Sequence, residues 1–312
     1  MRRTLSRVAQ GVLMVIVVYF ATRKVLSTWS QVRLAAAQVS PDWVIITISC
    51  VFVLAAYAVL VMVWQAMLGA WNSRLSFLQA AQIWTISNLG RYVPGKLWQL
   101  GAMVVMVQRQ GISKVAGAGS ALATTLVSVI TGFVVVAASG ATVLRYPRYA
   151  VMAIWVIGAA LLLLLPVSLP LLGRVVTRVC GRPVLLPRLA PSVVVRAILG
   201  TSLAWVFYGV AFQLLTKALL GSAPGGTALY VSIFAGSYLI GFLALFAPGG
   251  IVVREGIMQV ALRNAGFATG DAMVLVAASR LWLTIMEILP AIIFLLVQAR
   301  HGRAKAASKG AS

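Results

Sequence analysis

Acidic residues, histidine and cysteine are scarce in this sequence. The 312 residues include only four acidic side chains, one histidine and two cysteines. The histidine, His301, lies near the C-terminus, and Cys50 and Cys180 fall in a hydrophobic stretch and a basic stretch without pairing or metal-ligand spacing. This pattern excludes histidine-based catalysis in the hydrophobic region and a His/Cys metal centre. We therefore predict no metal and no cofactor.

Catalytic motifs are also missing. The sequence has no glycine-rich nucleotide loop after a strand, no aspartate pair that could hold a metal, and no nucleophile with an adjacent base. We assign no catalytic residue. An enzyme that acts on a lipid-linked substrate with Glu255 as base stays open as an alternative.

Charge of either sign is sparse, and hydrophobic residues dominate. Charged residues make up 10% of the chain, against roughly 25% in soluble domains, while 62% of residues are hydrophobic and the mean hydropathy is +1.01. Apolar runs long enough to cross a bilayer recur along the chain, which predicts an all-α polytopic membrane protein. The net charge of +22 comes from basic residues at segment ends, a placement that favours anionic lipid head groups over nucleic acid.

The hydropathy pattern predicts six full crossings and two interrupted stretches in one transmembrane domain, residues 1–312. The crossings are expected at about 8–27, 43–68, 115–144, 149–172, 193–219 and 270–299. The stretches 76–109 and 226–263 are each broken by a Pro-Gly sequence, "YVPGKLW" and "FAPGGIV". Each half is too short to cross comfortably, so we expect two re-entrant helical hairpins.

The two interrupted stretches occupy matching positions. Pro94 and Pro248 are 154 positions apart, as are Arg109 and Arg263. The same shift relates the repeats 43–144 and 193–299. Fifteen basic residues in the segments expected inside, against seven outside, predict a multi-pass protein of the cell (inner) membrane with both termini cytoplasmic. The repeats are then inverted, joined by a basic cytoplasmic linker at about 173–191 and followed by a disordered tail at 300–312.

Six charged residues fall at predicted membrane depth, where each costs at least about 2.5 kcal/mol at a helix centre. They are Arg91, Lys96, Arg254, Glu255, Arg280 and Glu287. Arg280 and Glu287 are too far apart on one helix face to pair with each other, so we expect Glu255 to meet Arg280, and Arg254 or Lys96 to meet Glu287.

Half-helix N-termini at the breaks would add partial positive charge beside these cations. We therefore predict an anion pocket in which Arg91, Lys96 and Arg254 hold a head-group phosphate and Glu255 and Glu287 compensate buried charge, with Asn88 and Gln99 as weaker members. The backbone breaks are expected at Pro94, Gly95, Pro248, Gly249 and Gly250. The alternative is that the charged residues form packing ion pairs or extend to the membrane surface.

The motifs "SNLGRYVPGKLWQLG" (87–101) and "APGGIVVREG" (247–256) resemble the transmembrane, flippase-type domain of lysylphosphatidylglycerol synthases. The common family form of the second motif has Gly where this chain has Val252. The resemblance implies the lipid-translocating part of these proteins, as a stand-alone member without the soluble synthase domain.

We predict a lipid flippase or lipid-binding transporter. Its substrate would be a phospholipid or a polyprenyl-linked lipid bound near the bilayer midplane. The alternatives are a membrane enzyme that transfers a group to or from a lipid carrier, and a structural partner of an envelope-lipid synthase.

Overall fold

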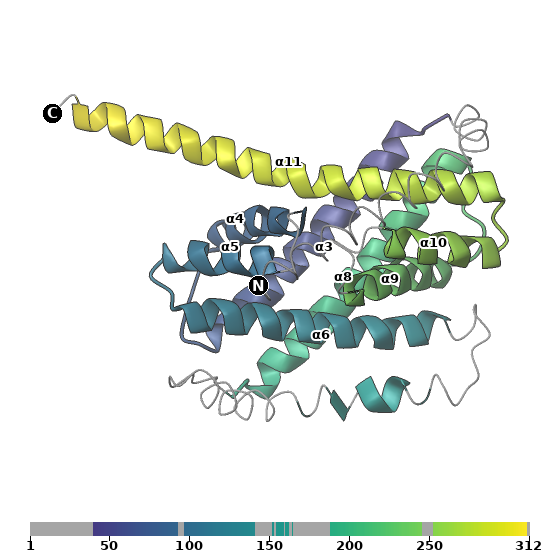
Figure 1. Cartoon of the computed structure of the whole chain (residues 1–312), viewed down its shortest axis with the longest axis horizontal. Helices are drawn as coiled ribbons and strands as arrows, with labels where there is room; N and C mark the ends of the chain where they lie inside the picture. Colours follow the sequence, from purple (N-terminus) through teal and green to yellow (C-terminus); the bar gives the residue numbers. More distant parts are fainter. Residues whose placement is uncertain are drawn as a thin grey trace, which may run out of the picture.

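The chain forms a bundle of helices in the computed structural model, which describes residues 40–92, 97–140, 188–244 and 252–310 and a few helical positions between 152 and 164 (Figure 1). Within these ranges there is no strand. The helices are α3 (Trp43–Gly69), α4 (Phe77–Asn88), η1 (Leu89–Tyr92), α5 (Leu97–Gln108), α6 (Lys114–Gly140), α8 (Pro191–Leu220), α9 (Thr227–Leu243), α10 (Val253–Asn264) and α11 (Thr269–Gly310).

Four of these helices are long and apolar enough to cross a membrane: α3, α6, α8 and residues Thr269–Val297 of α11. Between 22% and 39% of the residues in their most hydrophobic stretches are buried, which leaves most of each helix surface available to lipid. An all-helical membrane-embedded protein is therefore confirmed. The predicted crossings 43–68, 115–144, 193–219 and 270–299 correspond to these four helices; 8–27, and most of 149–172, lie outside the described residues.

Each interrupted stretch forms two short helices in place of one long helix. The first consists of α4, η1 and α5, and the second of α9 and α10. The two arms of each pair pack against each other. The break residues Pro94, Gly95, Pro248, Gly249 and Gly250 lie outside the described residues, as does most of the linker 173–191.

Local sequence explains where several helices begin. At the start of α3, the side chain of Asp42 accepts hydrogen bonds from the free N–H groups of Val44 and Ile45 in the first turn, at 2.9 and 3.1 Å. Ser76 and Gln79 form a capping box at the start of α4. Pro191 occupies the first turn of α8, where its missing N–H costs no hydrogen bond.

The order of elements repeats along the chain, and the repeats run in opposite directions where they meet. The series α3, α4, α5, α6 is followed by α8, α9, α10, α11. Asp42 N–H, before α3, donates to Ala218 C=O near the end of α8 at 3.0 Å, and Val63 near the end of α3 lies against Gly200 in the first half of α8. Equivalent helices α3 and α8 are therefore antiparallel along their length.

The close approach of α3 and α8 depends on a small residue. A Cβ atom on Gly200 would lie 2.4 Å from Cγ2 of Val63, which is too close for any real contact. Glycine therefore lets the two backbones approach, as small residues do in many membrane helix pairs. A hydroxyl pair, Thr131 to Thr201 at 2.8 Å, joins α6 to the same helix.

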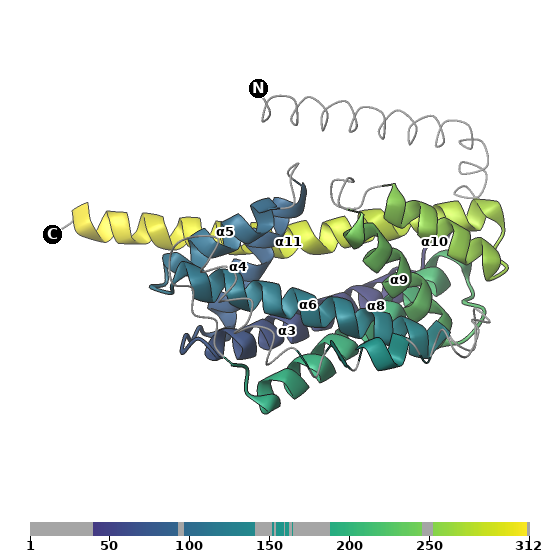
Figure 2. The same cartoon turned by 60° about the horizontal axis from the view of Figure 1, so that its bottom comes forward.

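Residues 300–310 belong to the stretch for which a disordered tail is predicted. They continue α11, which extends beyond the rest of the molecule in Figures 1 and 2. The physical reason is composition: "RHGRAKAASKG" is rich in alanine, lysine and arginine, which favour helix, and has no proline. Polarity alone suggested disorder.

Candidate functional site

Arg91 and Glu287 form the shortest ion pair among the described residues. Arg91 lies in η1, directly before the first interruption, and Glu287 lies in the membrane-length part of α11. Their Nη1 and Oε1 atoms are 2.5 Å apart, and the side chain of Glu287 is 8% exposed. The pair therefore fastens the interrupted part of the first repeat to the last helix of the second.

The same guanidinium also reaches α9. Nη1 of Arg91 lies 3.4 Å from the hydroxyl oxygen of Tyr238, which can accept a weak hydrogen bond. Tyr238 in turn packs on Trp205 and Phe234, with ring centroids 5.6 and 6.4 Å apart. Arg91 thus contacts both interrupted stretches and α11 from one position.

A second charged group lies at the start of α10. The Oε1 atom of Glu255 is 3.5 Å from Nη1 of Arg280 on α11 and 3.9 Å from Nη1 of Arg254. The other carboxylate oxygen of Glu255 accepts from the N–H of Val252 at 2.7 Å. Glu255 therefore caps the helix and is shared between two arginines, closer to Arg280.

Aromatic rings connect the two charged groups. The guanidinium carbon of Arg254 lies 5.5 Å from the centroid of the Phe234 ring, which stacks with Tyr238, the neighbour of Arg91. Cation–π attraction of this kind is worth roughly 0.5–2 kcal/mol, depending on desolvation. Arg91, Glu287, Arg254, Glu255 and Arg280 thus belong to one cluster, which we call the charged cluster.

Asn88 and Gln99 contact each other across the first interruption. The amide Nε2 of Gln99 donates to Oδ1 of Asn88 at 2.5 Å, and Asn88 is buried. A Cβ atom on Gly90 would lie 2.7 Å from the backbone nitrogen of Gln99, so η1 and the start of α5 touch through a glycine. These two amides hold the arms of the first helix pair together.

The structure confirms one predicted ion pair and gives Glu287 a partner that the sequence did not predict. Arg280 meets Glu255, as the sequence predicted. Glu287 meets Arg91, while Arg254 lies beside Glu255. Arg254 starts α10 facing α9 and is therefore not the partner seen for Glu287, whereas η1 brings Arg91 to α11. Lys96, the other expected partner, lies outside the described residues.

Sequence reasoning missed Tyr238 and Phe234 as neighbours of the two arginines. They lie four residues apart on α9 and share a face toward the interruption. That spacing was visible in the sequence, but aromatic residues at helical spacing usually belong to an ordinary core.

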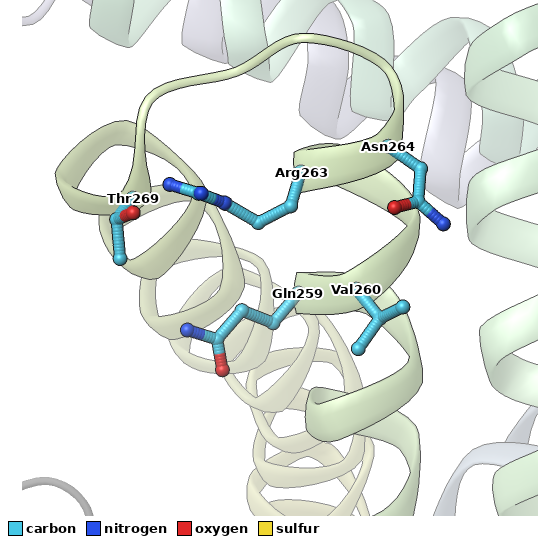
Figure 3. A pocket seen from close by; sticks show the side chains of 5 residues that line it. All are labelled: Gln259, Val260, Arg263, Asn264 and Thr269. Atoms are coloured by element: carbon cyan, nitrogen blue, oxygen red, sulfur yellow. The ribbon is translucent and has the colours of Figure 1, made fainter.

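A separate hollow lies at the turn between α10 and α11. It has a volume of about 520 Å³, opens widely to the surface, and is lined by Gln259, Val260, Arg263, Asn264 and Thr269 (Figure 3). Arg263 lies nine residues after Arg254, at the opposite end of α10. The hollow is therefore distinct from the charged cluster.

Comparison with protein-family models gave no match, and comparison with curated proteins gave no significant match.

Proposed function

We propose that the protein is a lipid flippase or lipid-binding transporter that holds an anionic head group at the charged cluster. The observation that carries this proposal is the assembly of three arginines and two carboxylates from η1, α10 and α11, beside the two interrupted helix pairs. Charged side chains inside a membrane bundle usually mark a substrate or ion pathway. Three cations against two anions leave the cluster with a net positive charge, which favours an anionic ligand.

The arrangement of elements favours a transporter over a protein that only binds lipid. Repeated elements with antiparallel α3 and α8 are the geometry expected of inverted repeats, and interrupted helices near such a repeat interface form the sites of many secondary transporters. On this proposal α4–α5 and α9–α10 are re-entrant hairpins that enter from opposite sides. The motif resemblance to the flippase-type domain of lysylphosphatidylglycerol synthases points the same way.

A lipid-modifying enzyme is less favoured by the geometry. Oε2 of Glu255 accepts from the N–H of Val252, and its Oε1 lies at ion-pair distance, 3.5 Å, from Arg280 without a hydrogen bond; Glu287 is engaged by Arg91. A general base must have a lone pair directed at a substrate proton. Paired carboxylates at both positions therefore fit charge compensation better than proton abstraction.

The proposal is tested with purified protein in liposomes. Labelled phosphatidylglycerol and labelled phosphatidylcholine are placed in both leaflets, and a membrane-impermeant quencher reports how much label reaches the outer leaflet. We expect the protein to expose more phosphatidylglycerol than protein-free liposomes do, and to move phosphatidylcholine less.

Applied pH and voltage gradients, in separate runs, show whether movement is coupled or passive. Arg196→Gln is the control, because Arg196 is exposed on α8 and away from the cluster. Equal quenching with and without protein, for both lipids and under every gradient, would refute lipid movement. Chemical conversion of the lipid, detected by mass spectrometry, would favour the enzyme instead.

A further inference from the structure

Arg254 is a buried arginine, and one edge of its guanidinium group lacks hydrogen-bond partners among the described residues. The residue is 4% exposed and its side chain 5% exposed. Its Nε and Nη2 atoms are buried, and neither has a hydrogen-bond partner among the described residues. A buried charged donor without an acceptor is costly, so a ligand that supplies the acceptors would stabilise this site.

The two unpaired donors lie on the same edge of the planar guanidinium group. Nε–H and the adjacent Nη2–H point in parallel and form the fork that binds two oxygens of a carboxylate or phosphate at once. The opposite side, at Nη1, faces Glu255 at 3.9 Å. The edge that is suited to bidentate binding is therefore buried and has no hydrogen-bond partner among the described residues.

The surroundings fix the guanidinium in place. The ring of Phe234 lies beside it, and a Cβ atom on Gly241 would approach the Cβ of Arg254 to 2.7 Å. Because α9 packs this tightly on the start of α10, the position of Arg254 is set by the helix pair. A fixed fork loses little conformational entropy when it binds a ligand.

The local charge matches a monoanion. Arg254 and Arg280 share Glu255, which lies closer to Arg280, so one positive charge remains in this group of three. The N-terminal turn of α10 adds partial positive charge. A phosphodiester carries one negative charge spread over two non-bridging oxygens, which fits both the charge and the fork.

The neighbouring surface favours a lipid as the source of that phosphodiester. Ile240, Phe242 and Leu243, on either side of Gly241 in α9, are between 42% and 51% exposed. Exposed apolar side chains next to a buried cation suit contact with the acyl chains of a lipid.

We propose that Nε and Nη2 of Arg254 bind the two non-bridging oxygens of a phospholipid phosphodiester. This inference rests on the proposed function. Arg91, which Glu287 already engages, then serves to join the repeats, and Arg254 is the main head-group contact.

The test measures lipid binding by native mass spectrometry of the full chain. The probes are phosphatidylglycerol, the same lipid with its phosphate methylated to a neutral triester, glycerol 3-phosphate and inorganic phosphate. We expect the parent protein to bind phosphatidylglycerol at least tenfold more tightly than the triester.

Arg254→Lys, which keeps the charge but lacks the fork, should weaken phosphatidylglycerol binding ten- to a hundredfold. Arg196→Lys should leave it unchanged.

Three outcomes would overturn the proposal. They are equal binding of diester and triester by the parent protein, equal phosphatidylglycerol binding by Arg254→Lys and Arg196→Lys, and displacement of the lipid by inorganic phosphate or glycerol 3-phosphate at matched concentration. The last outcome would identify a free-phosphate site. The comparison of diester with triester needs no variant, so it holds even where Arg254→Lys fails to fold. Lipid movement in liposomes that persists despite these outcomes would leave the proposed function standing and remove only the Arg254 site.

Discussion

At the scale of single residues, the backbone at Val252 is the clearest sign of local strain. Its φ angle is +74° and its ψ angle −44°, in a region that β-branched side chains rarely adopt. Its N–H is held by Glu255 at 2.7 Å, and the residue directly precedes α10. Strained backbone that persists is usually over-determined by its surroundings and often lies at functional sites.

Val252→Gly should raise stability, because glycine adopts this conformation without steric cost. Relief of one strained backbone position is worth about 1–3 kcal/mol, offset in part by the greater freedom of glycine in the unfolded chain. The measurement is the thermal unfolding midpoint in detergent. Val253→Gly is the control and should lower the midpoint, because Val253 has helical geometry. A lower midpoint for Val252→Gly would show that the valine side chain contributes more by packing than its backbone costs.

Sequence reasoning identified the five charged residues that form the charged cluster, but only part of how they pair. The Arg280–Glu255 pair followed from spacing along α11 and the position of the second interruption. The Arg91–Glu287 pair could not be predicted, because it depends on how η1 turns toward α11 after α4 ends. The lack of hydrogen-bond partners at Nε and Nη2 of Arg254 is likewise a property of three-dimensional packing and has no signature in the residue order.

At the scale of elements, Pro-Gly positions were good predictors of helix interruption. The stretches 76–109 and 226–263 agree with the outer ends of α4–α5 and α9–α10 to one residue. Proline and glycine act through the local backbone, so their effect is readable without knowing the fold. The contacts of these pairs with α11 are long-range, and apart from the Arg280–Glu255 pair they could not be predicted from the residue order.

The Arg91–Glu287 pair joins elements that are far apart in the chain, and a double-mutant cycle measures its contribution. Arg91→Gln and Glu287→Gln should each lower the free energy of unfolding by roughly 3–5 kcal/mol, because each leaves the other charge without its main partner. The double variant should lose less than the two single losses combined. The readout is unfolding of the purified protein by denaturant. Strictly additive losses would show that the two side chains do not act as a pair.

At the scale of the whole molecule, the repeated order of elements was predictable and the lipid-facing surfaces were not. The hydropathy pattern predicted most ends of the four long helices to within a few residues, since burial in a membrane requires continuous apolar runs. Which face of each helix packs inward depends on contacts such as Gly200 with Val63. Those contacts arise only when α3 and α8 are placed antiparallel.

The antiparallel arrangement makes a direct prediction about topology. Ser73 follows the end of α3 and Ser222 follows the end of α8, so the two residues lie at opposite ends of the α3–α8 pair. In a background with Cys50 and Cys180 replaced, single cysteines at Ser73 and Ser222 are exposed to an impermeant thiol reagent in intact cells. The excess of basic residues in the segments assigned to the inside predicts labelling at Ser222 and protection at Ser73.

Permeabilised cells provide the control, in which both positions should react. Labelling at Ser73 alone would reverse the orientation, and labelling at both in intact cells would contradict α3 and α8 as membrane-crossing helices.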